Sequence, residues 1–180
     1  MEIFDSDFRE IFSSQVVSII GGLIAGTILA IYTDQILLIP GMLILLPGFL
    51  EMRGNISGSS AARLTSGLFL GIIKPNKFRT KVIKGNMLAS FALAIAVSLV
   101  LGIIIFLFNF FALHAFTLKI ILLPLIAGII ANAIEIPMAI FVTFYLFRKG
   151  HDPNNIMGPF VTSTGDIVSI VALLISMVII

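Results

Sequence analysis

Charged residues are scarce in this chain of 180 residues: they make up only 11%, while hydrophobic residues make up 59%. A soluble domain carries about 25% charged residues, so this chain lacks the polar surface that would cover a globule in water. Cysteine is absent and there are only two histidines, which excludes disulfides, thiolate metal sites, a cysteine nucleophile and a histidine-rich metal site. The composition predicts an integral membrane protein that lies in the lipid bilayer, with no nucleic-acid partner.

Long apolar runs are abundant. A helix that crosses about 30 Å of hydrocarbon needs about 20 residues, and the apolar runs predict an all-α membrane domain with five spans, at about 13–33, 36–73, 85–110, 118–148 and 155–180. The second run is too long for one straight crossing. We expect it to tilt strongly, to extend beyond the membrane, or to break near Pro47–Gly54, and a break there would allow a re-entrant hairpin. The third run, whose only serines are Ser90 and Ser98, is expected to be the peripheral, lipid-facing helix.

Basic residues gather in two short loops, after the second and the fourth run. These residues are Lys74, Lys77, Arg79, Lys81 and Lys84 in the first loop, and Arg148 and Lys149 in the second. Five crossings would put both loops on the same side of the membrane. Because short cytoplasmic loops carry an excess of lysine and arginine, we expect the N-terminus in the cytoplasm and the C-terminus outside. We expect a multi-pass protein of the plasma membrane.

Several polar side chains fall at membrane depth. Asp166 lies near the middle of the last run, where a carboxylate costs about 2.5–3.5 kcal/mol on insertion scales. Helical spacing places Thr162 and Ser169 of the last run on the same face as Asp166. The other polar residues are Asn132 and Glu135 in the fourth run, and Glu51, Arg53, Asn55, Ser59 and Arg63 in the second. These helices therefore have sides that are unsuited to lipid.

Asp166 has no basic residue in its own helix, and Glu135 also lacks a partner within its run. Intramembrane carboxylates of this kind are stabilised by a cation, which is either an arginine or a permeating ion. Carboxylate, hydroxyl and amide oxygens, without sulfur or imidazole, suit a hard divalent cation. The pattern favours a cation transporter over an enzyme, a receptor or a scaffold. An enzyme is the weakest of these alternatives, because a hydrolase would need a nucleophile–base pair or a metal cluster.

Two stretches carry a resemblance to a known family. "RGNISGSSAARLTSG", at Arg53–Gly67, and "DPNNIMGPFVTSTGDIVSI", at Asp152–Ile170, resemble the second-helix and last-helix motifs of the MgtE-type magnesium transporters and their eukaryotic solute-carrier relatives. The resemblance implies an ion path lined by the second and fifth helices at a two-fold interface. It implies that Asp166 is the central acidic residue, that Asn55 and Gly54 line the path, and that Thr162 stands one turn before the aspartate. A chain with a single unit is then expected to form a homodimer.

The chain also departs from this pattern. Bacterial members carry a cytoplasmic magnesium-sensing region before the membrane domain, and we expect no soluble sensor domain here. Glu51 and Glu135 are additional acids, which could widen the ion site, carry a coupling ion, or pair with Arg53 and Arg63. Two alternatives to a simple pathway therefore stay open. One is a carrier that couples Mg²⁺ to Na⁺ or H⁺, and the other is a non-transporting module in which Asp166 pairs with Arg53 or Arg63 inside a closed bundle.

The expectation we adopt is a homodimeric, non-enzymatic transporter of divalent cations, with Mg²⁺ as the transported ion. The residues expected to hold the ion are Asp166, Asn55, Thr162, Glu135 and Glu51, and those expected to line its path are Gly54, Ser59, Ser169 and Asn132. We expect the passing ion, rather than an arginine, to neutralise Asp166; Arg53 and Arg63 are the candidate ion-pair residues.

Overall fold

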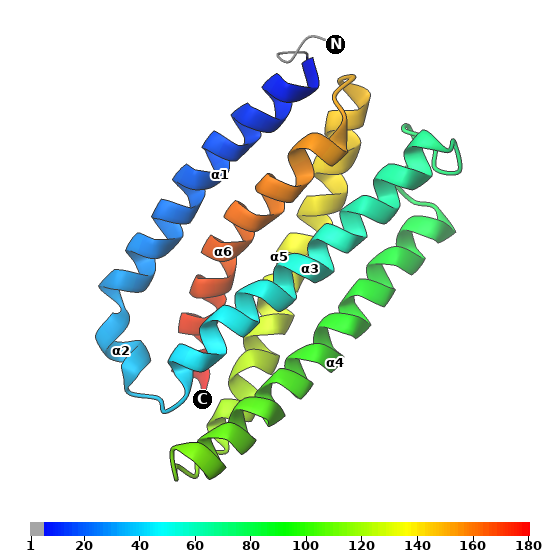
Figure 1. Ribbon diagram of the computed structural model, residues 1–180. Helices are drawn as coiled ribbons and strands as arrows, with labels where there is room; N and C mark the ends of the chain where they lie inside the picture. The colour runs from blue at the N-terminus through cyan, green and yellow to red at the C-terminus, as the bar shows by residue number, and fades with distance from the viewer. Residues whose placement is uncertain (1–5) are drawn as a thin grey trace.

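The computed structural model describes residues 6–180 as a bundle of helices (Figure 1). Residues 1–5, which begin the N-terminal segment expected in the cytoplasm, lie outside the described residues. The helices are α1 (Ser6–Ile31), α2 (Thr33–Leu37), α3 (Met42–Phe69), α4 (Lys81–Ala112), α5 (Lys119–Arg148) and α6 (Pro153–Ile179). No strand is present among residues 6–180, so the predicted all-α class is confirmed.

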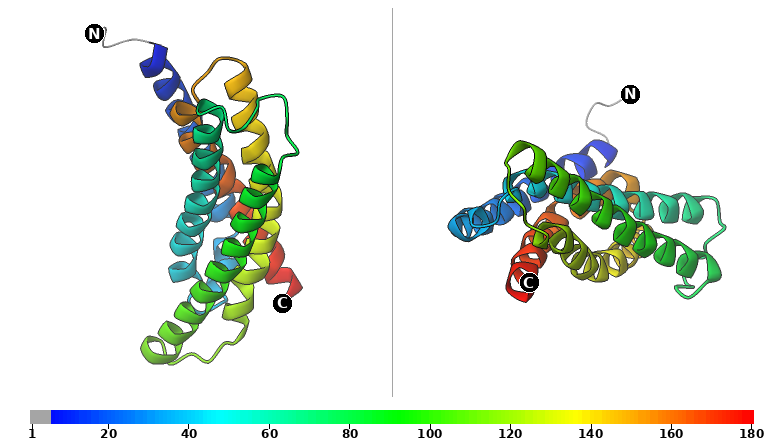
Figure 2. Two further views of the ribbon diagram at one scale, coloured as in Figure 1. Left: turned by 90° about the vertical axis from the view of Figure 1, so that its right-hand side faces the viewer. Right: turned by 90° about the horizontal axis from the view of Figure 1, so that it is seen from below.

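Four helices, α1, α4, α5 and α6, are long and apolar enough to cross a membrane. The fifth long helix, α3, has 28 residues and a length of about 42 Å at 1.5 Å per residue. It carries the charged residues Glu51, Arg53 and Arg63 in its interior, which lowers its hydropathy below that of its neighbours. The long helices run along one axis of the bundle (Figure 2).

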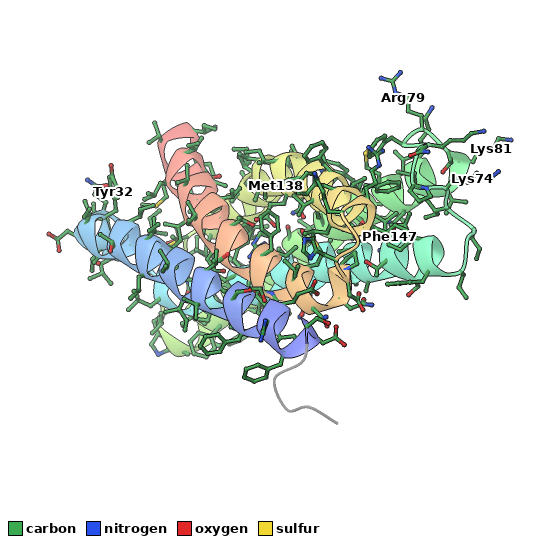
Figure 3. The ribbon with its side chains drawn as sticks, turned by 90° about the horizontal axis from the view of Figure 1, so that it is seen from above. Tyr32, Lys74, Arg79, Lys81, Met138 and Phe147 are labelled. Atoms are coloured by element: carbon green, nitrogen blue, oxygen red, sulfur yellow. The ribbon has the colours of Figure 1, made fainter. Side chains whose placement is uncertain are left out.

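The two basic loops lie at the same end of the bundle as the start of α1 (Figure 1). Lys74, Arg79 and Lys81 project from this end (Figure 3). The loops are joined there, because Arg148 donates a hydrogen bond of 2.8 Å to the carbonyl oxygen of Pro75 and its guanidinium lies 4.2 Å from the centre of the Phe78 ring. The C-terminus lies at the opposite end, near α2 (Figure 1).

The second apolar run is interrupted, but not where we expected. α3 is continuous through Pro47–Gly54, and the break lies at residues 38–41, between α2 and α3. Pro40 has no backbone N–H and disfavours helix in the residue before it, and Gly41 adopts a positive φ of 86° that favours glycine. Pro47 lies early in α3 and removes one backbone hydrogen bond without ending the helix.

α5 is the central helix of the bundle, in contact with α3, α4 and α6, whereas α1 packs mainly against α6. The expectation that the third apolar run lies at the periphery holds for one side of α4, which packs mainly on α3 and α5 and exposes many apolar side chains on the other side, but α1 is more exposed still. Ser90 and Ser98 of α4 are fully buried, and Gly102 lets α4 approach the backbone of α5 closely: a Cβ at Gly102 would lie 2.5 Å from the carbonyl oxygen of Ile121. The most exposed of the long helices is α1, whose side chains are mostly exposed.

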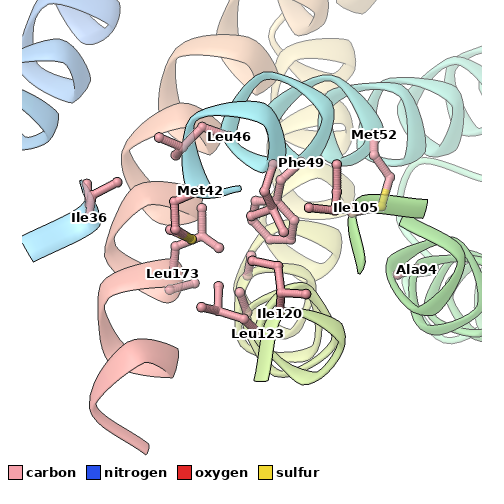
Figure 4. Close-up of a cluster of buried hydrophobic side chains, with 14 of the residues drawn as sticks. Ile36, Met42, Leu46, Phe49, Met52, Ala94, Ile105, Ile120, Leu123 and Leu173 are labelled. Carbon is pink, nitrogen blue, oxygen red and sulfur yellow. The ribbon is translucent and has the colours of Figure 1, made fainter. Parts of the chain in front are cut away.

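A cluster of buried apolar side chains fills the end of the bundle near α2 (Figure 4). Phe49 of α3 and Leu123 of α5 are fully buried in its centre, and Leu46 of α3 and Leu173 of α6 close the contact between these two helices. This cluster occupies the half of the α3–α6 contact that includes the C-terminal part of α6. Glu51, Asn55 and Asp166 lie nearer the basic loops than Leu46 and Leu173 do.

Candidate functional site

A cavity of about 520 Å³ lies where α3 and α6 meet. Five residues that the sequence analysis singled out for an ion path line it, together with the candidate ion-pair residue Arg53. The full lining is Pro47, Leu50, Glu51, Arg53, Gly54, Asn55 and Gly58 from α3, and Gly158, Val161, Thr162 and Asp166 from α6. The structure therefore brings together Asp166, Asn55, Thr162, Glu51 and Gly54, which come from two stretches far apart in the sequence.

Helical spacing explains why polar groups of each helix share the cavity. Residues four apart lie on the same face of a helix, and the amide nitrogen of Asn55 donates a 3.0 Å hydrogen bond to Glu51, one turn before it. On α6, the hydroxyl of Thr162 donates to the carbonyl oxygen of Gly158 at 3.1 Å, and Asp166 follows one turn later. The cavity is thus lined by two carboxylates, an amide and a hydroxyl.

Glycine gives the cavity its width. A Cβ built on Gly54, Gly58 or Gly158 would meet no atom within 4 Å. These positions face open space rather than a neighbouring helix, so their missing side chains leave room instead of permitting tight packing. The expectation that Gly54 lines the same space as Asn55 agrees with this geometry.

Arg53 contacts two acids at the wall of the cavity. Its guanidinium donates through Nη1 to Glu135 of α5 and to the carbonyl oxygen of Val161 at 3.3 Å, and through Nη2 to Asp166 at 3.3 Å. Glu135 also accepts a 3.2 Å hydrogen bond from Ser57. The side chains of Arg53 and Glu135 are 0% and 1% exposed, whereas that of Asp166 is 25% exposed. Asp166 is therefore the most exposed member of this group.

This arrangement corrects the expectation that a passing ion, rather than an arginine, neutralises Asp166. The sequence analysis found no base within the last helix, but α3 supplies one from a neighbouring position. The contact is the one that the non-transporting alternative requires. That alternative also requires a closed bundle, and the bundle is hollowed beside Asp166.

Other candidate residues lie away from the cavity. Ser169 and Asn132 are fully buried, and the amide nitrogen of Asn132 donates to the carbonyl oxygen of Gly128 within α5 at 2.8 Å. Ser59 is exposed and donates to the carbonyl oxygen of Ile56. Arg63 donates to Asn86 at 2.7 Å and to Ser90 at 3.3 Å.

Glu51 forms neither of the ion pairs considered for it, because Arg53 is engaged with Glu135 and Asp166, and Arg63 with α4. Glu135 lies behind Arg53 and outside the cavity lining. The Arg53 guanidinium thus pairs with two carboxylates, those of Glu135 and Asp166, and Glu51 lines the same cavity without an ion pair to any described residue.

Gly165 was missed by the sequence analysis. A Cβ at this position would overlap the guanidinium of Arg53, so the absence of a side chain is what allows Arg53 to reach Asp166 and Glu135. Ser57 was missed as well, although it donates to Glu135. A single sequence gives no signal for either, because a small residue beside an acid in a membrane helix usually reflects helix packing.

A second, smaller cavity of about 190 Å³ lies beside the first, on the side of the basic loops. It shares Gly58 and Gly158 with the first cavity and extends along α3 and α6 to Thr65 and Asn154. In the other direction, Leu46 and Leu173 of the apolar cluster fill the contact between the same helices. Both cavities therefore lie on the basic-loop side of these apolar residues.

The cavity does not form a cage of protein ligands for a metal. Within residues 6–180, no three histidine, cysteine or acidic side chains are grouped closely enough to hold an ion. A cation that retains its own water does not need such a cage, since Mg²⁺ dehydrates reluctantly and is often held through one or two carboxylates.

Comparison with known proteins adds one finding. A family model described as MgtE, a divalent cation transporter, matches residues 46–176. The matched range begins beside Pro47 in α3 and ends in the last turn of α6, so it includes every residue that lines the cavity. No curated protein and no solved structure matches the chain.

Proposed function

Since the chain belongs to the MgtE family of divalent cation transporters, we propose that its transported ion is Mg²⁺ and that the ion passes beside Asp166 along the α3–α6 cavity. The observation that carries this proposal is the convergence of Asp166, Thr162, Glu51 and Asn55 on one cavity. All four present oxygen atoms, which are the ligands that Mg²⁺ prefers.

The size of the cavity supports passage of a hydrated ion. Six waters at about 30 Å³ each fill about 180 Å³, well below the cavity volume of about 520 Å³. Mg²⁺ demands octahedral coordination and usually keeps several of its waters. In the proposed mechanism, Asp166 attracts the ion through its charge, and Asn55 and Thr162 accept hydrogen bonds from the water shell.

The proposal includes five crossings and a homodimer. A fifth crossing by α3 would keep both basic loops on the cytoplasmic side of the plasma membrane, as the charge rule requires. Glu51 and Asn55 are exposed along the side of α3 that lines the cavity, and lipid disfavours such side chains. Pairing α3 and α6 of two protomers about a two-fold axis would remove this polar face from lipid and would place two Asp166 side chains along one path.

Flux through proteoliposomes tests the role of Asp166. Asp166→Asn keeps the shape of the side chain and removes its charge, so we expect Mg²⁺ influx to fall to the level of empty vesicles. Asp34→Asn is the matched control, because Asp34 is an exposed acid of α2 at the other end of the bundle and should retain wild-type influx. Wild-type influx through Asp166→Asn would refute the proposed site, and equal loss in both variants would show that the loss is not specific to the cavity.

The Arg53–Asp166 contact favours the non-transporting alternative as a second candidate. In that case Asp166 serves only to neutralise a buried arginine. This candidate predicts that wild-type vesicles and empty vesicles take up Mg²⁺ at the same rate, which the same experiment measures.

A further inference from the structure

We propose that Arg53 is a fixed counter-charge of the ion site, held in place by Glu135, which limits the affinity of Asp166 for a divalent cation so that the ion can leave. The inference rests on the proposed function of Asp166. It assigns roles to Arg53 and Glu135, whereas the family match gives no role to any single residue. Arg53 acts on the ion through Asp166, and Glu135 is a positioning residue because it acts through Arg53.

The geometry divides the guanidinium unequally between the two acids. Nη1 is shared by Glu135 and the carbonyl oxygen of Val161, and Nη2 alone reaches Asp166. Glu135 is fully buried, whereas the side chain of Asp166 is 25% exposed toward the cavity. Because Glu135 also draws on the positive charge of Arg53, Asp166 keeps part of its negative charge for an ion in the cavity.

Stability alone does not account for this arrangement. A buried ion pair contributes little net stability, because desolvation of both charges offsets their attraction, and apolar residues of similar volume often serve as well. The pair is also incompletely satisfied: within residues 6–180, Nε of Arg53 and Oε1 of Glu135 have no hydrogen-bond partner. Gly165 leaves space for a guanidinium that an apolar side chain would not need.

Ion conduction explains why an arginine lies beside Asp166. An ion site in a pathway must bind strongly enough for entry and weakly enough for exit. Two bare aspartates of a dimer, at membrane depth and in a low dielectric, would hold a divalent ion strongly. A positive charge fixed 3.3 Å from each Asp166 carboxylate lowers that attraction.

Two variants change the charge beside Asp166 in opposite directions. Arg53→Met with Glu135→Gln removes one positive and one negative charge, so the net charge of the chain is unchanged, but the positive charge that is lost lies nearer to Asp166. Glu135→Gln alone removes one negative charge, so the positive charge of Arg53 is then balanced by Asp166 alone. Coulomb's law predicts that Kd for Mg²⁺ falls in the first variant and rises in the second, each by on the order of tenfold or more.

The experiment measures Kd from the Mg²⁺ dependence of the thermal unfolding midpoint of the full chain in detergent, with Mg²⁺ flux in proteoliposomes as a second readout. In the double variant we expect tighter binding with slower flux at saturating Mg²⁺, a combination that loss of packing would not produce. Electrostatic free energy is proportional to the charge of the ion. The logarithm of Kd for Na⁺ should therefore shift in the same direction by about half as much.

Shifts of both variants in the same direction, or unchanged Kd in both, would overturn the inference. If the double variant does not fold, Glu135→Gln alone decides: a raised Kd supports the inference and an unchanged Kd overturns it. These outcomes differ from failure of the proposed function. In that case the wild-type chain shows no stabilisation by Mg²⁺, or Asp166→Asn keeps the wild-type stabilisation.

Discussion

Gly165→Ala is expected to destabilise the protein strongly, because the new methyl group would occupy the space of the Arg53 guanidinium. Arg53 would have to withdraw from Glu135 and Asp166, which leaves a buried charge without its partner. Breaking a buried ion pair from one side costs about 3–5 kcal/mol. Alanine gains about 1 kcal/mol over glycine from helix propensity, so we expect a net loss of about 2–4 kcal/mol in the free energy of unfolding.

Gly26→Ala is the matched control for this change. Gly26 lies in the interior of α1, and a Cβ there would meet no atom within 4 Å, so we expect unchanged or slightly increased stability. Thermal and denaturant unfolding of both variants in the same detergent measures the difference.

A second background separates overlap from other effects of the methyl group. In Arg53→Met with Glu135→Gln the guanidinium is absent, and a flexible methionine can move aside. Gly165→Ala should then cost less than about 1 kcal/mol, and the difference between the two backgrounds is the coupling free energy of a double-mutant cycle. Equal stability of Gly165→Ala and Gly26→Ala in the wild-type background would show that Arg53 does not lie against Gly165, and the account of the site would fail.

Two further predictions concern the bundle and its assembly. Gly102→Ala should lower the free energy of unfolding by about 1–3 kcal/mol, because its Cβ would meet the backbone of α5 at Ile121; unchanged unfolding would contradict the close α4–α5 contact. Since the chain has no cysteine, Ser59→Cys on the exposed face of α3 should be cross-linked to a dimer in membranes by a short bismaleimide, as judged on a denaturing gel. Leu99→Cys on the exposed side of α4 should not, and equal cross-linking of both would argue against pairing through α3 and α6.

Much of the fold could be predicted from the sequence, because long apolar runs between basic or polar loops leave few alternatives to membrane helices. The break in the second run was misplaced. Pro47–Gly54 contains a proline and two glycines, yet α3 runs through it. A proline in the second turn of a helix removes a hydrogen bond and crowds the carbonyl four residues before it, but here it does not end the helix. Pro40 and Gly41 lie at the boundary itself, where restricted backbone and a positive φ stop the helix.

The site was predictable in part, since spacing along one helix shows which residues share a face but not what that face meets. Thr162 and Asp166 face the cavity. Ser169, only three residues further along α6, turns into the core. The contacts of Arg53 with Glu135 and Asp166 join three helices, with Gly165 making room for them, and no pattern within a single helix could indicate this. Tertiary packing decides such contacts.

The central claim is that Asp166 attracts a divalent cation despite the guanidinium beside it. The most direct test is the thermal unfolding midpoint of the purified full chain, titrated with Mg²⁺ and, at matched ionic strength, with Na⁺. A cation that binds the folded state raises the midpoint according to its occupancy. We expect Mg²⁺ to raise the midpoint of the wild-type chain well beyond the effect of Na⁺ and to leave that of Asp166→Asn unchanged; an equal Mg²⁺ response in the two proteins would contradict the account.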